Sequence, residues 1–269
     1  MPQTAQILDG KKSQEFYTKK LIQKIQDLSF VPTLVVIQVG NRKDSTTYIK
    51  VKKAFAELIG AQVIHIHLDE NVTQEEVIRN VKNYNTDDSV QGIIVQLPLP
   101  QHLTAKEIVD SVTKEKDVDG LVPYTKFLAA TARGIKELLE FYKINLSGKK
   151  VTMLGRSNIV GKPTALMCAQ EGAIVTVCHS ATEHIEEKTK SADIVIVAIG
   201  KPKLINQNYL SKGQVVIDVG ITRHIDNNSL VGDVDFEAVK DIVAKITPVP
   251  GGVGQMTVLA LFENLVDAC

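Results

Sequence analysis

Hydrophobic residues along the chain fall into short continuous runs separated by longer stretches with helical spacing. Residues 32–40 (PTLVVIQVG) form one such run, which predicts a buried strand ending at Gly40. Further strands are expected at 61–68, 91–100, 149–155, 173–180, 192–200 and 214–220. Helices are expected at 12–28, 73–85, 133–143, 159–172, 182–190 and 253–269. Short apolar strands separated by helices favour parallel βαβ units.

Capping residues indicate where individual helices begin and end. Asp44 or Ser45 can cap a helix that runs to about residue 59, and Gly60 can end it. Thr73 is the expected N-cap of the next helix. The pattern predicts two α/β lobes joined near 133–143, with a return of the chain to the first lobe after Pro248.

Composition excludes several classes of protein. The chain has 269 residues, 44% of them hydrophobic, with 31 basic and 31 acidic residues. Zero net charge, 5% aromatic content and the absence of Trp argue against a nucleic-acid partner. Three cysteines without CxxC spacing indicate neither a disulfide framework nor a zinc site. No apolar run is long enough for a membrane span, so a cytoplasmic protein is the expectation.

A glycine-containing turn between a strand and a helix suggests a dinucleotide site. The segment MLGRSNIVGKP places Gly155 and Gly161 where backbone N–H groups can approach a phosphate. The next strand ends in Cys-His-Ser180 without an acid, and Arg156 lies in the turn. A cation and a hydroxyl without a carboxylate suit the 2′-phosphate of NADP. An ordinary βα turn with a solvated arginine remains the alternative.

Candidate catalytic residues lie in the N-terminal half. Tyr48 and Lys52 are four residues apart on an expected helix and share a face, although spacing alone favours the alternative that Lys52 lies on a solvated helix edge. Gln96 ends an apolar strand, where a polar side chain needs a partner or a ligand. Asp119 in KDVDG can accept hydrogen bonds from an amino-pyrimidine, or simply cap its loop.

One further segment is a candidate for ligand binding, and one pair of histidines is not expected to bind a metal. The loop TPVPGGVG (247–254) allows close backbone approach to a ligand, and Ile221 follows a strand-ending glycine where it could pack near a nicotinamide. His65 and His67 alternate on a strand with no other metal-binding residues beside them, so no metal site is expected.

Taken together and in this order, several of these segments resemble the methylenetetrahydrofolate dehydrogenase/cyclohydrolase family. The matching segments are TYIKVKKA, GIIVQLPLP, KDVDG, GRSNIVGKP, TVCHSAT, GDVDF and TPVPGGVG. The resemblance implies an α/β protein of two lobes, with an N-terminal catalytic lobe, a Rossmann-like NADP lobe and a cleft between them. It assigns 1–132 and 248–269 to the folate-binding lobe and 133–247 to the NADP lobe. It also implies a homodimer.

The resemblance implies a function and a set of site residues. The function is NADP-dependent oxidation of 5,10-methylenetetrahydrofolate followed by hydrolysis of the methenyl product to 10-formyltetrahydrofolate. The implied catalytic residues are Lys52, Tyr48, Gln96 and Asp119. The implied cofactor-binding residues are Gly155, Arg156, Ser157, Ser180 and Ile221. The implied substrate-binding residues are Tyr48, Lys52, Gln96, Leu97, Asp119, Pro250, Gly251 and Gly252.

The sequence departs from the family pattern in three places. The segment after Asp119 is shorter, and three alanines (129, 130 and 132) replace a stiff Pro-Cys-Thr-Pro turn. Gln255 stands where the family has proline, and Thr222 stands where it has asparagine. We therefore expect weaker folate binding than the family pattern gives.

Two other readings of the sequence are weighed against this one. A short-chain dehydrogenase shares the Tyr48-x-x-x-Lys52 spacing, but there the glycine-rich turn precedes that pair, whereas here it follows by about a hundred residues. A folate- or nucleotide-binding regulatory protein with reduced or single activity stays open.

Overall fold

The structure is a computed structural model that describes residues 4–223 and 229–269. The chain divides into two compact units. Unit 1 contains the described part of Met1–Glu15 together with that of Thr131–Thr257, and unit 2 contains Phe16–Ala130 and Val258–Cys269. Three helices contain residues of both units: α1 (Gly10–Gln26), α5 (Ala130–Phe141) and α9 (Val253–Asp267).

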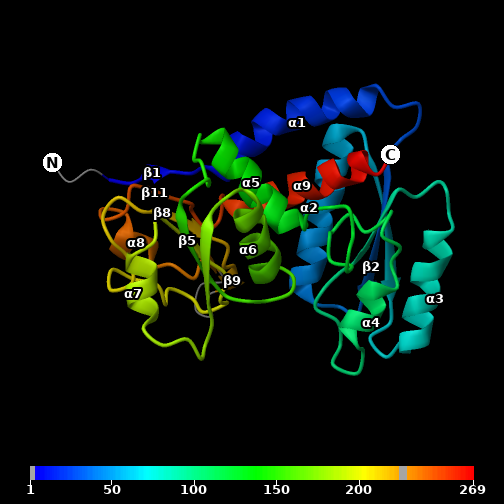
Figure 1. The fold of residues 1–269 in the computed structure, drawn as a ribbon. Helices are drawn as coiled ribbons and strands as arrows, with labels where there is room; N and C mark the ends of the chain where they lie inside the picture. The colour runs from blue at the N-terminus through cyan, green and yellow to red at the C-terminus, as the bar shows by residue number, and fades with distance from the viewer. Residues whose placement is uncertain (1–3, 224–228) are drawn as a thin grey trace. The chain divides into compact units, whose positions relative to one another are not determined.

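Unit 1 contains a six-stranded sheet in which every pairing is parallel, in the order β1-β11-β8-β7-β5-β6. Figure 1 labels β1, β11, β8 and β5 of this sheet. Its strands are β1 (Gln6–Ile7), β5 (Lys150–Leu154), β6 (Ile174–Cys178), β7 (Ile194–Val197), β8 (Val215–Asp218) and β11 (Lys245–Ile246). Strand β7 is buried along its whole length, as expected for a central strand covered on both faces. The carboxyl ends of β8, β7, β5 and β6 therefore lie along one edge of the sheet.

Helices and a small ribbon complete unit 1. Helix α6 (Gly161–Gln170) packs against β5 and β6. The shorter helices are α7 (Ile185–Lys190) and α8 (Phe236–Val239). Strands β9 (Thr222–Arg223) and β10 (Leu230–Val231) pair antiparallel just beyond the end of β8.

Unit 2 is built on a three-stranded parallel sheet in the order β3-β2-β4. The strands are β2 (Thr33–Val39), β3 (Gln62–Leu68) and β4 (Gly92–Val95), and the helices are α2 (Lys43–Ile59), α3 (Gln74–Asn85) and α4 (Ala105–Asp110). All residues of β2 and β4 are buried, and α2 packs against β3.

The C-terminal part of α9 belongs to the core of unit 2. Phe262 is fully buried, and its ring centroid lies 5.5 Å from that of Phe55 on α2. The Asn264 side chain donates to the carbonyl oxygens of Val118 and Leu128 at 2.8 and 2.9 Å. These two bonds hold the two ends of the segment 118–128, which contains Asp119.

The structure confirms some predicted helix ends and contradicts one. Thr73 is the N-cap of α3 and accepts from the Glu76 N–H, and Gly60 ends α2 in the left-handed conformation. The prediction that Asp44 or Ser45 caps α2 is wrong, because the N-cap is Arg42. In the described part of the chain, no helix is long and apolar enough to cross a bilayer.

Candidate functional site

Lys52 and Gln96 meet in unit 2. Lys52 lies on α2 between Ile49 and Phe55, which are buried and fix the rotation of the helix. Gln96 follows the last residue of β4, at the carboxyl end of a strand beside β2. The Lys52 Nζ donates to the Gln96 Oε1 at 2.9 Å. The Gln96 Nε2 donates to the Leu97 carbonyl oxygen at 2.9 Å, which fixes the amide so that its oxygen faces the lysine.

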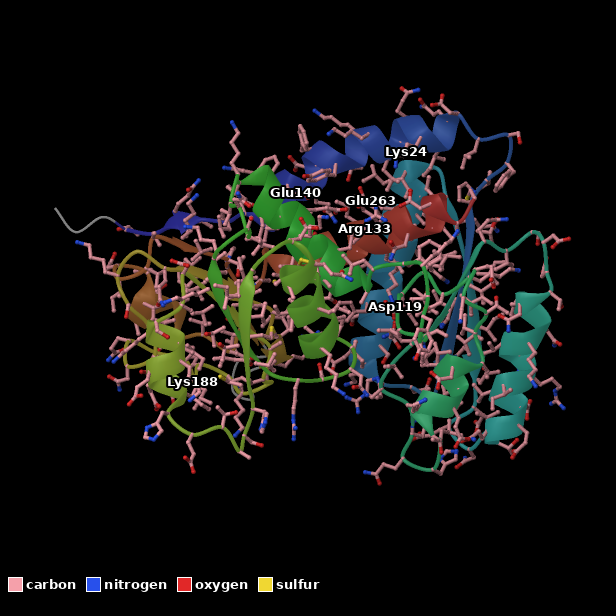
Figure 2. All side chains as sticks on the ribbon, in the orientation of Figure 1. Lys24, Asp119, Arg133, Glu140, Lys188 and Glu263 are labelled. Atoms are coloured by element: carbon pink, nitrogen blue, oxygen red, sulfur yellow. The ribbon has the colours of Figure 1, made fainter. Side chains whose placement is uncertain are left out.

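Asp119, which is labelled in Figure 2, is the charged partner of Lys52. Burial lowers the pKa of Lys52 from its usual value, and the negative charge of Asp119 opposes part of that shift. Burial raises the pKa of Asp119, and the positive charge of Lys52 opposes it. A lysine with a lowered pKa can accept and return a proton near neutrality.

The two acids of KDVDG have different environments. The Asp117 carboxylate accepts hydrogen bonds from the N–H groups of Leu121 and Val122 at 3.2 and 2.8 Å, so Asp117 is the residue that caps the loop. Burial raises the pKa of Asp117 to about 6. Among the residues that the structure describes, the Asp119 side chain accepts no comparable hydrogen bonds from its loop, and its charge acts on Lys52.

The shortened segment returns directly to Asp119. The Ala130 N–H donates to the Asp119 carbonyl oxygen at 3.1 Å. Gly120 has a φ of 72°, and a side chain there would lie 2.6 Å from the Ala129 backbone. Ala129, Ala130 and Ala132 are buried. Small residues are therefore needed where the segment closes on itself.

Tyr48 lies one helical turn before Lys52 on α2, and 37% of its surface is exposed. Residues four apart share a helix face, so a ligand that contacts the lysine can also contact Tyr48. Leu97 is partly exposed and is followed by a cis peptide bond to Pro98. Within unit 2, the structure thus brings Lys52, Gln96 and Asp119 together, with Tyr48 and Leu97 adjacent along the chain.

The turn after β5 has the close packing that a dinucleotide site requires. Gly155 has a φ of 111°, and a Cβ there would overlap the Ala198 carbonyl oxygen at the end of β7. A Cβ on Gly161 would overlap the Gly155 carbonyl oxygen. The Ser157 Oγ accepts from the N–H groups of Val160 and Gly161, both at 3.2 Å, and so shapes the first turn of α6.

The polar residues predicted to bind the 2′-phosphate of NADP lie at the carboxyl edge of the unit 1 sheet. Arg156 follows β5 and Ser180 follows β6, and both are exposed. Strands β5 and β6 are neighbours, so these residues end adjacent strands. The tip of β6 carries no carboxylate, which fits a 2′-phosphate and its negative charge. The residues present therefore fit NADP.

Ile221 and the loop before α9 lie together in unit 1. Ile221 is 41% exposed, and its Cδ1 lies 3.4 Å from the position that a Cβ on Gly254 would take. Gly251 has a φ of 102°, and its carbonyl oxygen accepts a hydrogen bond from the Gly10 N–H at 2.8 Å. Gly252 packs closely against Gly10. Pro250 is exposed and follows a cis peptide bond. The predicted substrate residues 250–252 thus belong to a different unit from Lys52.

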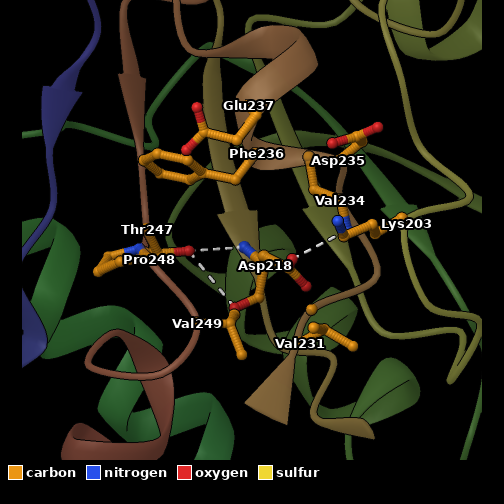
Figure 3. Close-up of a pocket in the computed structure, with 11 residues that line it drawn as sticks. Lys203, Asp218, Val231, Val234, Asp235, Phe236, Glu237, Thr247, Pro248 and Val249 are labelled. Atoms are coloured by element: carbon orange, nitrogen blue, oxygen red, sulfur yellow. Dashed lines mark hydrogen bonds between the residues drawn. The ribbon is translucent and has the colours of Figure 1, made fainter. Parts of the chain in front are cut away.

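Two buried acids, Asp218 and Asp233, were not singled out from the sequence. Asp218 is the last residue of β8, and its carboxylate accepts from the N–H groups of Gly220, Asp233 and Val234 at 2.9, 3.1 and 2.9 Å. Thr247 holds the backbone of Asp218 (Figure 3). Burial raises the pKa of Asp218 to about 7. An acid that directly follows the apolar run of β8 was the available signal, because a buried polar group needs partners.

The histidines of β3 have structural partners. The His65 Nε2 lies 3.0 Å from the Gln38 Oε1, and the His67 Nε2 lies 3.0 Å from the Gly40 carbonyl oxygen. Their rings stack with a centroid separation of 5.8 Å. Within residues 4–223 and 229–269, no three His, Cys, Asp or Glu residues form a group that could hold a metal ion.

Comparison with known proteins identifies the family. Residues 8–119 match the tetrahydrofolate dehydrogenase/cyclohydrolase catalytic domain, and residues 129–269 match the NAD(P)-binding domain of the same family. The bifunctional protein FolD of Bacillus pumilus is 43% identical over 98% of both chains.

Solved structures agree with this match. The bifunctional FolD of Campylobacter jejuni has a TM-score of 0.95 and 41% identity, covering 98% of each chain. The Trypanosoma brucei FolD, solved with NADP cofactor and inhibitor, has a TM-score of 0.94 and 35% identity, covering 99% of this chain and 97% of that one. This chain belongs to the tetrahydrofolate dehydrogenase/cyclohydrolase family.

Proposed function

We propose that this chain oxidises 5,10-methylenetetrahydrofolate with NADP and hydrolyses the methenyl product to 10-formyltetrahydrofolate. The observation that carries the proposal is the hydrogen bond from Lys52 to Gln96 beside the charge of Asp119. Simple binding of a folate does not require a lysine with a lowered pKa, whereas proton transfer does. Relatives named as bifunctional enzymes support both activities.

The oxidation step uses the residues at the carboxyl edge of the unit 1 sheet. NADP, when bound at this edge, would supply the hydride acceptor that oxidation of the one-carbon bridge to the methenyl cation requires. Gly155 and Ser157 shape the turn that receives the pyrophosphate. Arg156 and Ser180 would hold the 2′-phosphate, and Ile221 would lie beside the nicotinamide.

The hydrolysis step uses the residues of unit 2. A water molecule adds to the cationic methenyl carbon and loses one proton to leave a hydroxyl group. The hydroxyl then loses its proton as the carbon–nitrogen bond breaks, and the leaving nitrogen takes up a proton, so that the formyl group forms with net release of one proton. Neutral Lys52 accepts the proton of the water, and Gln96 holds the amine in position. Asp119 anchors the pterin ring and moderates the fall in the lysine pKa.

The proposal also assigns the folate-binding and NADP-binding parts to ranges of the chain. Residues 1–132 and 248–269 supply the folate-binding part, and 133–247 supply the NADP-binding part. Tyr48 and Leu97 contact the folate in addition to the residues that act in hydrolysis. The roles of Pro250, Gly251 and Gly252 in substrate binding are carried over from the family motif.

We also propose a cytoplasmic homodimer that binds neither nucleic acid nor membrane. Strand β6 lies at the end of the described sheet order, so one side of it has no neighbouring strand there. Ile174, Val177 and the nearby Leu166 of α6 are 63%, 41% and 60% exposed. An exposed apolar strand edge is a ready surface for pairing with a second copy. Sedimentation of wild type and of an Ile174→Lys variant tests the dimer, and a monomeric wild type would contradict it.

The function is tested by turnover. Purified protein is mixed with methylenetetrahydrofolate and NADP, and NADPH and 10-formyltetrahydrofolate are measured separately. Lys52→Met is the test variant, and Lys50→Met on the same helix is the matched control, because Lys50 is exposed. We expect both products from wild type and Lys50→Met, and loss of the formyl product from Lys52→Met. Absence of both products from wild type would contradict the proposal.

A further inference from the structure

The ends of strands β7 and β8 are joined by two aspartates and two glycines. Asp218 ends β8 and Gly220 follows it, while Gly232 and Asp233 follow β10. All four residues are buried. This group lies at the edge of the sheet where the NADP residues are found, and none of the four was assigned a role in binding or catalysis.

Asp233 connects two strand ends. Its Oδ2 accepts hydrogen bonds from the N–H groups of Ile199 and Gly200, which follow β7, at 2.7 and 2.9 Å. The same carboxylate occupies the space beside Gly220, where a Cβ would overlap it. Asp233 therefore fixes the backbone after β7 relative to the backbone after β8.

Asp218 forms the reciprocal half of the arrangement. A Cβ on Gly232 would overlap the Asp218 carboxylate, just as one on Gly220 would overlap that of Asp233. The Asp218 Oδ1 also accepts from the Asp233 N–H, which orients the second aspartate. Neither glycine has a φ in the left-handed region, so glycine is needed at both positions for space. Figure 3 shows Asp218 held between Thr247 and Val234.

The arrangement is costly if its only role is stability. The Asp233 Oδ1 is enclosed and has no hydrogen-bond partner among the described residues. A buried acceptor without a partner destabilises the folded state, and a well-packed apolar group of similar volume is often more stabilising. The Asp233 carboxylate is retained although it lowers the free energy of unfolding. This indicates that the backbone after β7 and β8 must be held in one conformation.

Gly200 and Gly220 lie where placement matters for the cofactor. Gly220 directly precedes Ile221. Gly200 follows β7, the strand that lies between β5 and β8 in the sheet. Ligands of open parallel sheets bind at the carboxyl ends of the strands. We propose that Asp233 is a positioning residue for the NADP site, holding the backbone of Ile199–Gly200 and of Gly220–Ile221 in the conformation that receives the nicotinamide half of the cofactor. This inference rests on the proposed function.

The test compares Asp233→Ala, which removes the acceptor, with Asp233→Asn, which keeps one oxygen for both N–H groups. NADP affinity is measured by calorimetry, and kcat and KM are measured for the dehydrogenase step. The cyclohydrolase step is measured from methenyltetrahydrofolate without NADP. We expect Asp233→Ala to weaken NADP binding about tenfold and to lower the dehydrogenase kcat, with the cyclohydrolase rate unchanged. Asp233→Asn should recover most of the loss.

A matched control separates positioning from loss of stability. Val239→Ala removes a fully buried side chain from the apolar core of the same unit. It should lower the melting temperature without changing NADP affinity. If Asp233→Ala changes NADP affinity and the dehydrogenase kcat no more than Val239→Ala does, the inference is overturned.

Gly220→Ala gives a second route if Asp233→Ala does not fold. The added methyl displaces the Asp233 carboxylate without removing it, so the same selective loss of NADP binding is expected. Wild-type NADP affinity in Gly220→Ala would overturn the inference. If the wild-type protein itself binds no NADP, the proposed function fails and this inference with it. Unchanged variants of an NADP-binding wild type overturn the inference alone.

Discussion

The Nζ of Lys52 lies 2.9 Å from the Oε1 of Gln96, and this hydrogen bond joins helix α2 to the end of strand β4. The bond fixes the direction of the lysine amine, and burial around the amine lowers its pKa. Direction and pKa are the two properties that a general base needs. Neither is visible in the lysine-rich sequence of α2.

Replacing Lys52 by Met should abolish most of the hydrolysis of methenyltetrahydrofolate. General acid–base groups contribute about 10²–10⁴-fold to a rate, so a loss of that size is expected in kcat. NADP affinity, measured by calorimetry, should be unchanged. Lys50→Met should behave as wild type. Hydrolysis by Lys52→Met at the wild-type rate would remove the lysine from the mechanism.

The pH dependence of hydrolysis should report the Lys52–Asp119 pair. Neutral Lys52 is the active form, so the rate rises with pH through the lysine pKa, which burial lowers. The negative charge of Asp119 raises that pKa, so Asp119→Asn should move the rising limb to lower pH. Glu57→Gln, at the exposed end of α2, makes the same charge change and should leave the limb in place. A limb that moves to higher pH in Asp119→Asn contradicts the assignment.

Arg156 should determine the preference for NADP over NAD. A hydrogen bond to a charged group contributes about 1.5–3 kcal/mol, so Arg156→Ala should raise the KM for NADP about 10- to 100-fold and leave that for NAD nearly unchanged. Lys190→Ala, an exposed cation on α7, is the control for net charge. Equal kcat/KM values for the two cofactors in wild type would refute this role.

The Asp218 carboxyl should titrate at about pH 7, well above the usual value of 3.8. The folded state then holds a proton that the unfolded chain releases at lower pH. The contribution of Asp218 to the unfolding free energy is therefore full below about pH 4 and declines as pH rises to about 7. Carbon-detected NMR of the carboxyl group, assigned by its absence in Asp218→Asn, measures the titration. A midpoint near 3.8 would show that the three backbone N–H groups outweigh burial.

The alternation of strands and helices could be predicted because the longer strands consist mainly of apolar residues. Strands β2 and β7, for example, are buried along their whole lengths and are visible as such in the sequence. The pairing of β1 with β11 was not predicted, because two-residue strands have no periodicity and their partners are more than 230 residues apart. The cap of α2 was predicted wrongly because Ser45, a favourable cap residue, is buried inside the first turn of the helix.

The sequence indicated the residue types of the candidate site but not their contacts, because those contacts join segments that are far apart along the chain. Lys52 and Gln96 lie on different elements, so their hydrogen bond depends on how α2 packs. Residue spacing alone favours a solvated lysine. Asp117 and Asp119 look alike in the sequence, and only their partners distinguish a loop cap from a charge that acts on Lys52. The space beside Gly220 is filled by a residue from another segment, which no local pattern reveals.

The most direct test of the central claim is the product balance of a single reaction mixture. Wild-type protein is incubated with methylenetetrahydrofolate and NADP, and NADPH, methenyltetrahydrofolate and 10-formyltetrahydrofolate are followed together. If one chain carries both steps, the formyl product accumulates with NADPH in wild type, and methenyltetrahydrofolate accumulates in its place wherever Lys52→Met still forms NADPH. Formation of NADPH by wild type with no formyl product, or no NADPH at all, would contradict the account.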